Sequence, residues 1–143
     1  MKEVIKSLES ILANNYALTI KTQNYHWNVT GPNFKSLHLL FEEQYVDLAA
    51  ANDVLAERIR QLGGKVDASF EAFAKLSEIK NGGSNLDAAM MLEDLSASNR
   101  TVCKLLHDGI KIAQKHADEG TADILITRLE ACEKSIWMLE ASL

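Results

Sequence analysis

The chain has 143 residues, 47% of them hydrophobic and 24% charged, which suits a single domain over residues 1–143 that buries a core without disulfides or zinc. Its 15 Lys and Arg residues against 20 Asp and Glu residues give a net charge of −5. This acidity disfavours non-specific binding to nucleic acid or to an anionic membrane. No apolar run approaches the roughly 18 residues that cross a bilayer.

Four long helices are expected between breaks made by glycine and proline. Their approximate bounds are Lys2–Trp27, Phe34–Leu62, Asn85–His116 and Thr121–Ala141. Gly31-Pro32-Asn33 ends the first helix and Gly63-Gly64 ends the second. Ser84 followed by Asp87 has the spacing of a capping signal and predicts the start of the third helix.

About twenty residues, from Gly63 to Ser84, connect the second and third long helices. Phe70, Phe73 and Leu76 predict one short amphipathic helix there, because a structureless loop of that length is unusual in a compact domain. The other two connections are short and join antiparallel neighbours. This pattern predicts an all-α fold, a ferritin-like four-helix bundle with a short extra helix in the long crossover between helices 2 and 3.

The second long helix has two distinct faces when its residues are placed about 100° apart on a helical wheel. One is an ordinary apolar core face. The other points away from the core and carries His38, Glu42, Val46, Ala49, Asp53, Ala56 and Glu57. His38 and Glu42 are one turn apart and can share a ligand, and the same holds for Asp53 and Glu57.

These two pairs are centred about 22 Å apart along the helix, so one chain does not close a metal site with both. Two copies laid antiparallel about a two-fold axis near residues 47 and 48 bring His38 to Glu57 of the partner subunit and Glu42 to Asp53 of the partner subunit. Such an isologous interface makes two equivalent sites, each built from both chains. Imidazole with several carboxylates suits iron, manganese or zinc. The alternative is a solvated helix face with scattered charges.

His26 stands at the end of the first helix, where it can fold over the start of the second and add an imidazole near His38. The alternative is a packed helix-end residue. Cys103 and Cys132, 29 residues apart, form neither a disulfide framework nor a Cys-x-x-Cys motif; they fit a reducing compartment and are expected to belong to the packing. The first nine residues lack the apolar stretch of a signal peptide, so we expect a cytoplasmic protein.

One run of the sequence is specific enough to indicate a family. The run from His26 to Gly31, its twelve-residue step to His38, and the residues that follow on the second helix strongly resemble the Dps family of ferritin-like mini-ferritins, also called DNA-protecting proteins of starved cells. Further matching positions are Pro32, Asn33, Phe34, Leu37, Phe41, Glu42, Tyr45, Asp53, Ala56, Glu57, Arg58, Ile59, Glu133, Lys134, Trp137 and Met138. The resemblance covers essentially the whole chain.

The resemblance implies a ferroxidase: a hollow dodecamer that oxidises ferrous iron, preferably with hydrogen peroxide, stores the ferric product inside and protects the cell from oxidative stress. Its iron centre would lie between two-fold-related subunits, in agreement with the pairing above. Carried over by position, one subunit supplies His26, His38 and Glu42, and its partner supplies Asp53 and Glu57. The family usually has aspartate at the position of Glu42, so the extra methylene leaves the occupancy of the second iron position open.

Trp27 matches a tryptophan that lies near the iron site in relatives, which implies a sink for stray oxidising equivalents, an interface anchor, or both. Asp118 and Asp123 flank the start of the fourth helix in a pattern that resembles the stretch lining the family's negatively charged three-fold pores. A ring of carboxylates there would concentrate cations for entry. The alternative is that these acidic residues stabilise a helix N-terminus.

Three other functions compete with this interpretation. A di-iron oxidase with its site inside the bundle needs Glu-x-x-His pairs, but the residues three positions before the four histidines are Gln23, Lys35, Lys104 and Ala113. A DNA-compacting member of the family usually carries a lysine-rich tail, whereas the first nine residues balance two lysines with two glutamates, so DNA binding is not expected. A metal-free helical assembly protein predicts no ferrous oxidation.

Overall fold

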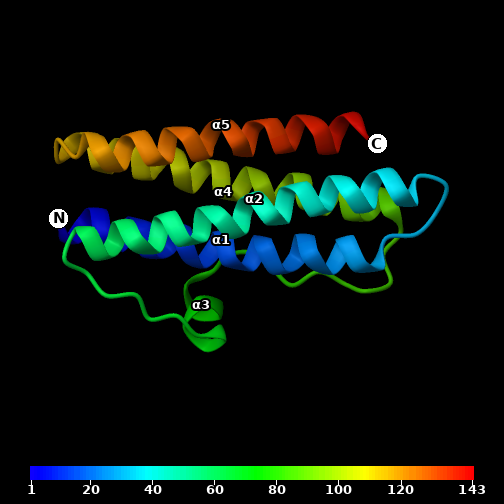
Figure 1. Ribbon diagram of the computed structural model, residues 1–143, viewed down its shortest axis with the longest axis horizontal. Coiled ribbons are helices and arrows are strands. Elements are labelled where there is room, and N and C mark those ends of the chain that lie inside the picture. Colours follow the sequence, from blue (N-terminus) through cyan, green and yellow to red (C-terminus); the bar gives the residue numbers. More distant parts are fainter.

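Five helices make up the chain in the computed structural model, which describes residues 1–143. They are α1 (Lys2–Asn28), α2 (Phe34–Gln61), α3 (Phe70–Leu76), α4 (Ala88–Lys115) and α5 (Glu119–Ala141). The four long helices lie side by side, with α1 antiparallel to α2 and α4 antiparallel to α5 (Figure 1). The predicted all-α four-helix bundle is confirmed. No helix combines the length and apolar composition needed to cross a bilayer.

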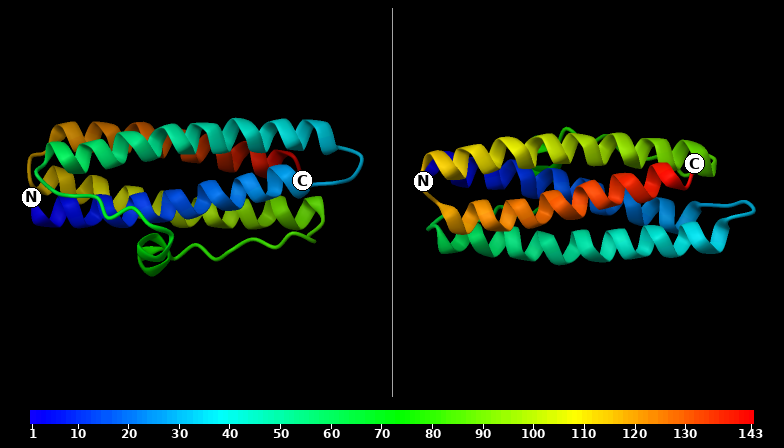
Figure 2. Two further views of the ribbon diagram at one scale, coloured as in Figure 1. Left: turned by 60° about the horizontal axis from the view of Figure 1, so that its bottom comes forward. Right: turned by 90° about the horizontal axis from the view of Figure 1, so that it is seen from above.

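The long connection from α2 to α4 runs along the outside of the bundle and carries α3 (Figure 2). The predicted crossover helix is therefore present, and none of its residues is fully buried. Its Phe73 ring stacks on Tyr16 of α1, with ring centroids 4.7 Å apart. This contact docks the crossover against α1 and leaves the opposite side of the bundle uncovered.

The predicted start of the third long helix is wrong by three residues. The structure begins α4 at Ala88, and the cap is Asp87, whose carboxylate accepts a hydrogen bond from the Met90 backbone N–H at 2.9 Å. An aspartate with extended backbone satisfies the free N–H groups of a first turn by itself, so Ser84 stays outside the helix. The last helix begins at Glu119, two residues earlier than expected, because Asp118 caps it.

The core lies between the four long helices and is mostly aliphatic. Its fully buried large side chains are Leu8, Ile11, Leu18, Tyr25, Phe41, Leu55, Ile59, Met91, Leu95, Leu106, Leu125 and Leu139. Burial of each such side chain stabilises the fold by about 1.5–3 kcal/mol. A methyl group added at Gly109 would lie 2.8 Å from Ile11 Cδ1 and 3.0 Å from Leu125 Cδ1, so glycine permits α4 to pack closely between α1 and α5.

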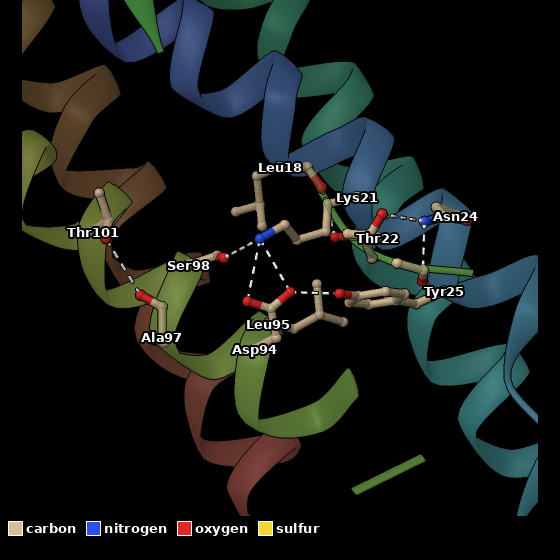
Figure 3. Close-up of polar contacts among 12 residues, drawn as sticks. Leu18, Lys21, Thr22, Asn24, Tyr25, Asp94, Leu95, Ala97, Ser98 and Thr101 are labelled. Atoms are coloured by element: carbon tan, nitrogen blue, oxygen red, sulfur yellow. Dashed lines mark hydrogen bonds and ion pairs between the residues drawn. The ribbon is translucent and has the colours of Figure 1, made fainter. Parts of the chain in front are cut away.

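An ion pair between a buried lysine and a partly exposed aspartate joins the end of α1 to α4 (Figure 3). Lys21 is 4% exposed, and its Nζ lies 3.1 Å from Asp94 Oδ2 and donates to Ser98 Oγ at 3.0 Å. Tyr25 Oη donates to the same carboxylate at 2.5 Å. Burial and this hydrogen bond raise the pKa of Tyr25 above its usual range, so the hydroxyl remains a donor. These contacts hold the last turn of α1, which carries His26.

Candidate metal centre

The turn between α1 and α2 brings two imidazoles together. The rings of His26 and His38 are stacked, with centroids 3.8 Å apart and planes 11° apart. His26 Nδ1 lies 2.7 Å from the backbone oxygen of His38, and His38 Nδ1 lies 2.6 Å from the backbone oxygen of His26. A carbonyl oxygen only accepts, so each Nδ1 carries the proton and each Nε2 presents a lone pair. Neither Nε2 has a hydrogen-bond partner within the chain.

Two further aromatic rings hold this pair in place. Phe34 stacks on the His38 ring at a centroid distance of 5.1 Å, and the edge of Tyr45 meets His26 at 5.1 Å. His26 is 6% exposed and His38 is half-buried. Imidazoles whose Nδ1 protons are bound to carbonyls and whose planes are fixed by packing are typical of metal ligands, because the outer contacts set the tautomer and the orientation.

The predicted carboxylates are all exposed on α2. Glu42 lies one turn after His38, whereas Asp53 and Glu57 lie at the far end of the helix, about 22 Å from His38 or beyond at the rise of an α-helix. None of the three forms an ion pair within the chain. No group of three or more His, Cys, Asp or Glu side chains within one chain is placed to hold a metal ion. The structure brings the two imidazoles together and leaves Asp53 and Glu57 apart from them.

Three large apolar side chains on or next to α2 are exposed near these residues in the sequence. Val46, between Glu42 and Asp53 on α2, is 54% exposed, and Val54 is 46% exposed. Trp27, next to His26, is 65% exposed and stacks on neither imidazole. Exposed large apolar side chains that lie together are typical of an interaction surface, and burial against a second chain would remove these three from water.

The two acidic residues predicted for an entry pore have different surroundings. Asp118 is buried: its Oδ1 accepts from Arg58 Nη2 at 2.8 Å and from the Thr121 backbone N–H at 3.1 Å, and its Oδ2 accepts from Thr121 Oγ1 at 2.6 Å. Burial raises the pKa of Asp118, but the hydrogen bonds from Thr121 and Arg58 outweigh it and hold the pKa below its usual 3.8. Asp123 is exposed and forms no ion pair.

We expect Asp118→Ala to lower the free energy of unfolding by about 1–2 kcal/mol near neutral pH, because the cap of α5 and the partner of Arg58 are both lost. The pKa of Asp118 is lower in the folded chain, so its stabilising contribution is present above about pH 4 and is lost as the pH falls through the folded-state pKa. Thermal unfolding at pH 7 and pH 3 measures this. Asp123→Ala is the control; equal losses in the two variants would contradict the assignment.

Several residues of the site were missed in the sequence. Phe34 and Tyr45 stand four residues before and seven residues after His38, which are helical neighbours on its face, so spacing could have found them. No spacing in the sequence predicts the reciprocal hydrogen bonds between the two histidines, because these bonds depend on how the turn of residues 29–33 folds back. The pairing of Arg58 with Asp118 was also missed, because the two residues are 60 positions apart in the chain and no local pattern relates them.

Four long antiparallel helices with one long crossover define a ferritin-like protein, and the family model of the ferritin-like domain matches residues 5–143. The DNA protection during starvation protein 2 of Bacillus anthracis is 37% identical over 142 residues, covering 99% of this chain and 97% of the relative. The chain belongs to the Dps family.

Solved structures of the family superpose closely on this fold. Dps from Staphylococcus aureus has a TM-score of 0.96 at 34% identity and covers 100% of this chain, with 96% of that protein covered. Dps from Vibrio cholerae, described as a member of a broad superfamily of ferritin-like diiron-carboxylate proteins, has a TM-score of 0.94 at 32% identity, with 98% and 88% covered. The resemblance drawn from the sequence is confirmed.

Proposed function

We propose that this protein is a ferroxidase and iron store that oxidises ferrous iron, preferably with hydrogen peroxide. The observation that carries the proposal is the stacked pair of His26 and His38, each with a proton-free Nε2 and no partner for it within the chain. Nitrogen and carboxylate oxygen donors suit iron and stabilise the ferric state better than soft ligands do. Membership of a family whose Vibrio cholerae relative is described as a diiron-carboxylate protein supports the choice of iron.

The complete site needs two chains. One chain supplies His26, His38 and Glu42, and an antiparallel copy of α2 supplies Asp53 and Glu57 of the partner subunit. Val46 and Ala49 then face each other near the two-fold axis, where exposed apolar side chains gain burial. The reach of Glu42, one carbon–carbon bond longer than aspartate, sets how tightly the second iron position is held.

The chemistry is a two-electron reduction of peroxide. Two ferrous ions give one electron each to hydrogen peroxide, which takes up two protons and leaves as two waters, so no hydroxyl radical is released. The imidazoles and carboxylates hold the ferrous substrate close enough for both electrons to reach one oxidant. Trp27, exposed beside His26, would take up stray oxidising equivalents or anchor the interface.

Storage requires a larger assembly. We propose a hollow dodecamer in the cytoplasm, with ferric product inside and ferrous iron entering by pores near the start of α5. Asp123 is the free carboxylate of the predicted pore pair, whereas Asp118 acts first as the cap of α5. Relatives are named for protecting DNA, but the net charge of −5 disfavours contact with DNA phosphates, so protection would come through removal of iron and peroxide.

The test adds ferrous iron and peroxide to the purified, assembled protein and follows ferric absorbance and particle mass together. We expect His26→Ala/His38→Ala to slow oxidation at least about tenfold, since loss even of supporting groups costs metal sites that much. His107→Ala, an exposed histidine on α4, should leave the rate unchanged. Equal rates in wild type and the double variant would exclude this site, and a particle no larger than a dimer would exclude storage.

A further inference from the structure

Two thiols meet between α4 and α5, on helices that carry none of the proposed iron ligands. Cys103 Sγ lies 2.8 Å from Cys132 Sγ, and both cysteines are free. A disulfide bond is about 2.05 Å long, so the two sulfur atoms need to approach by less than about 1 Å to bond. The separation of Cys103 and Cys132 in the sequence matches no known cysteine motif, so the sequence did not predict this contact.

The antiparallel pairing of α4 and α5 explains the contact. Cys103 lies 14 residues before Ala117, and Cys132 lies 14 residues after Asp118, so the two are equally far from the turn that joins the helices. In an antiparallel hairpin, residues equally far from the turn lie opposite each other. Farther from the turn, Ser96 Oγ of α4 donates a hydrogen bond to Glu140 of α5 at 2.8 Å. This contact fits the same alignment of the two helices.

The two thiols differ in access. Cys132 is 5% exposed and donates to the backbone oxygen of Asn99 at 3.1 Å. Cys103 is only half-buried and can be reached from solvent. Contact with Cys103 and burial both raise the pKa of the Cys132 thiol, so Cys132 is the partner that stays protonated. Accessible thiolates are the ones that oxidants attack.

We infer that Cys103 and Cys132 form a peroxide-sensitive dithiol that closes reversibly into a disulfide between α4 and α5. Cys103 loses its thiol proton, and the thiolate attacks one oxygen of hydrogen peroxide; the O–O bond breaks, an S–O bond forms, and the hydroxide that leaves takes up that proton and becomes water. The Cys132 sulfur then attacks Cys103, the S–S bond forms, the S–O bond breaks and water leaves with the thiol proton. Two thiols and one peroxide become one disulfide and two waters. The step uses no iron and does not depend on the proposed ferroxidase centre.

The test treats the assembled full chain, freed of metal by a chelator, with hydrogen peroxide, and then alkylates the remaining thiols for intact-mass analysis without reductant. We expect wild type to lose both free thiols and two hydrogen atoms per chain while keeping the mass of a single chain, and dithiothreitol to restore both thiols. Cys132→Ser should stop at a Cys103 sulfenic acid that dimedone captures. Cys103→Ser should leave the buried Cys132 unreacted.

Three results would overturn the inference: two intact thiols after peroxide treatment, over-oxidation of Cys103 beside a free Cys132, or a disulfide that links two chains. Ferrous oxidation by Cys103→Ser is expected to equal that of wild type, because Cys103 contributes nothing to the iron centre. A variant with a normal iron rate and no dithiol chemistry therefore separates the two proposals.

Discussion

Two variants that are each expected to oxidise ferrous iron slowly will recover ferrous oxidation when their chains assemble together. His26→Ala/His38→Ala lacks the imidazoles, and Asp53→Ala/Glu57→Ala lacks the carboxylates that the partner subunit is proposed to supply. In a two-fold dimer with one chain of each kind, one site receives all of its ligands and the other keeps only Glu42. Equal amounts pairing at random should therefore restore about one quarter of the wild-type rate.

The measurement is the ferric absorbance after peroxide addition, made on particles that were dissociated and reassembled as a mixture. Native mass spectrometry shows whether mixed particles have formed. The matched control mixes His26→Ala/His38→Ala with a chain that carries all four alanines, where no pairing completes a site. Mixed particles without recovered oxidation would rule out a site shared between chains, whatever the activity of the wild type.

Loss of the Asp94 carboxylate will destabilise the bundle by about 3 kcal/mol, the lower part of the range for breaking a buried ion pair. The reason is Lys21, whose side chain is 3% exposed, whereas that of Asp94 is 35% exposed. Asp94→Asn removes the negative charge, so the buried ammonium of Lys21 keeps only neutral partners, among them Ser98. The midpoint of thermal unfolding, compared at one protein concentration because the assembly shifts it, measures the loss.

The control variant also removes the positive charge of Lys21. Lys21→Met/Asp94→Asn leaves no buried ammonium and keeps an amide oxygen for the Tyr25 hydroxyl, so most of the stability should return. A double-mutant cycle gives the coupling between the two positions. Additive losses from the two substitutions would show that the ion pair contributes little. We expect the His26 end of α1 to loosen in Asp94→Asn, with slower iron oxidation as a second readout.

The helices could be predicted from the sequence because their causes are local. The apolar period of α2 and the breaks at Gly31-Pro32 and Gly63-Gly64 act within a few residues, and the predicted bounds of α2 differ from the structure by one residue. The start of α4 was wrong because Ser84 and Asp87 are both good capping residues. Only the packing of the crossover decides which of them has the extended backbone that a cap requires.

The candidate site also has a part that the sequence predicts and a part that depends on the tertiary structure. Helical spacing alone places His38 next to Glu42 and Asp53 next to Glu57. It also puts the two pairs too far apart along the helix to bind the same metal ion. The contact of His26 with His38, with each ring bound to the other's carbonyl, depends on the path of the intervening turn. Whether Asp53 and Glu57 complete the site depends on a second chain.

The sequence by itself determined four long helices, a long crossover, an acidic surface and the residue types that suit iron. Its periodicity and its breaks act over one or two helical turns. Over that range, the number of residues between two positions determines how far apart they lie. The tertiary structure decided which distant side chains meet: Arg58 with Asp118, Lys21 with Asp94, and Cys103 with Cys132. Those meetings depend on the alignment of packed helices, which the contacts of the whole core set together.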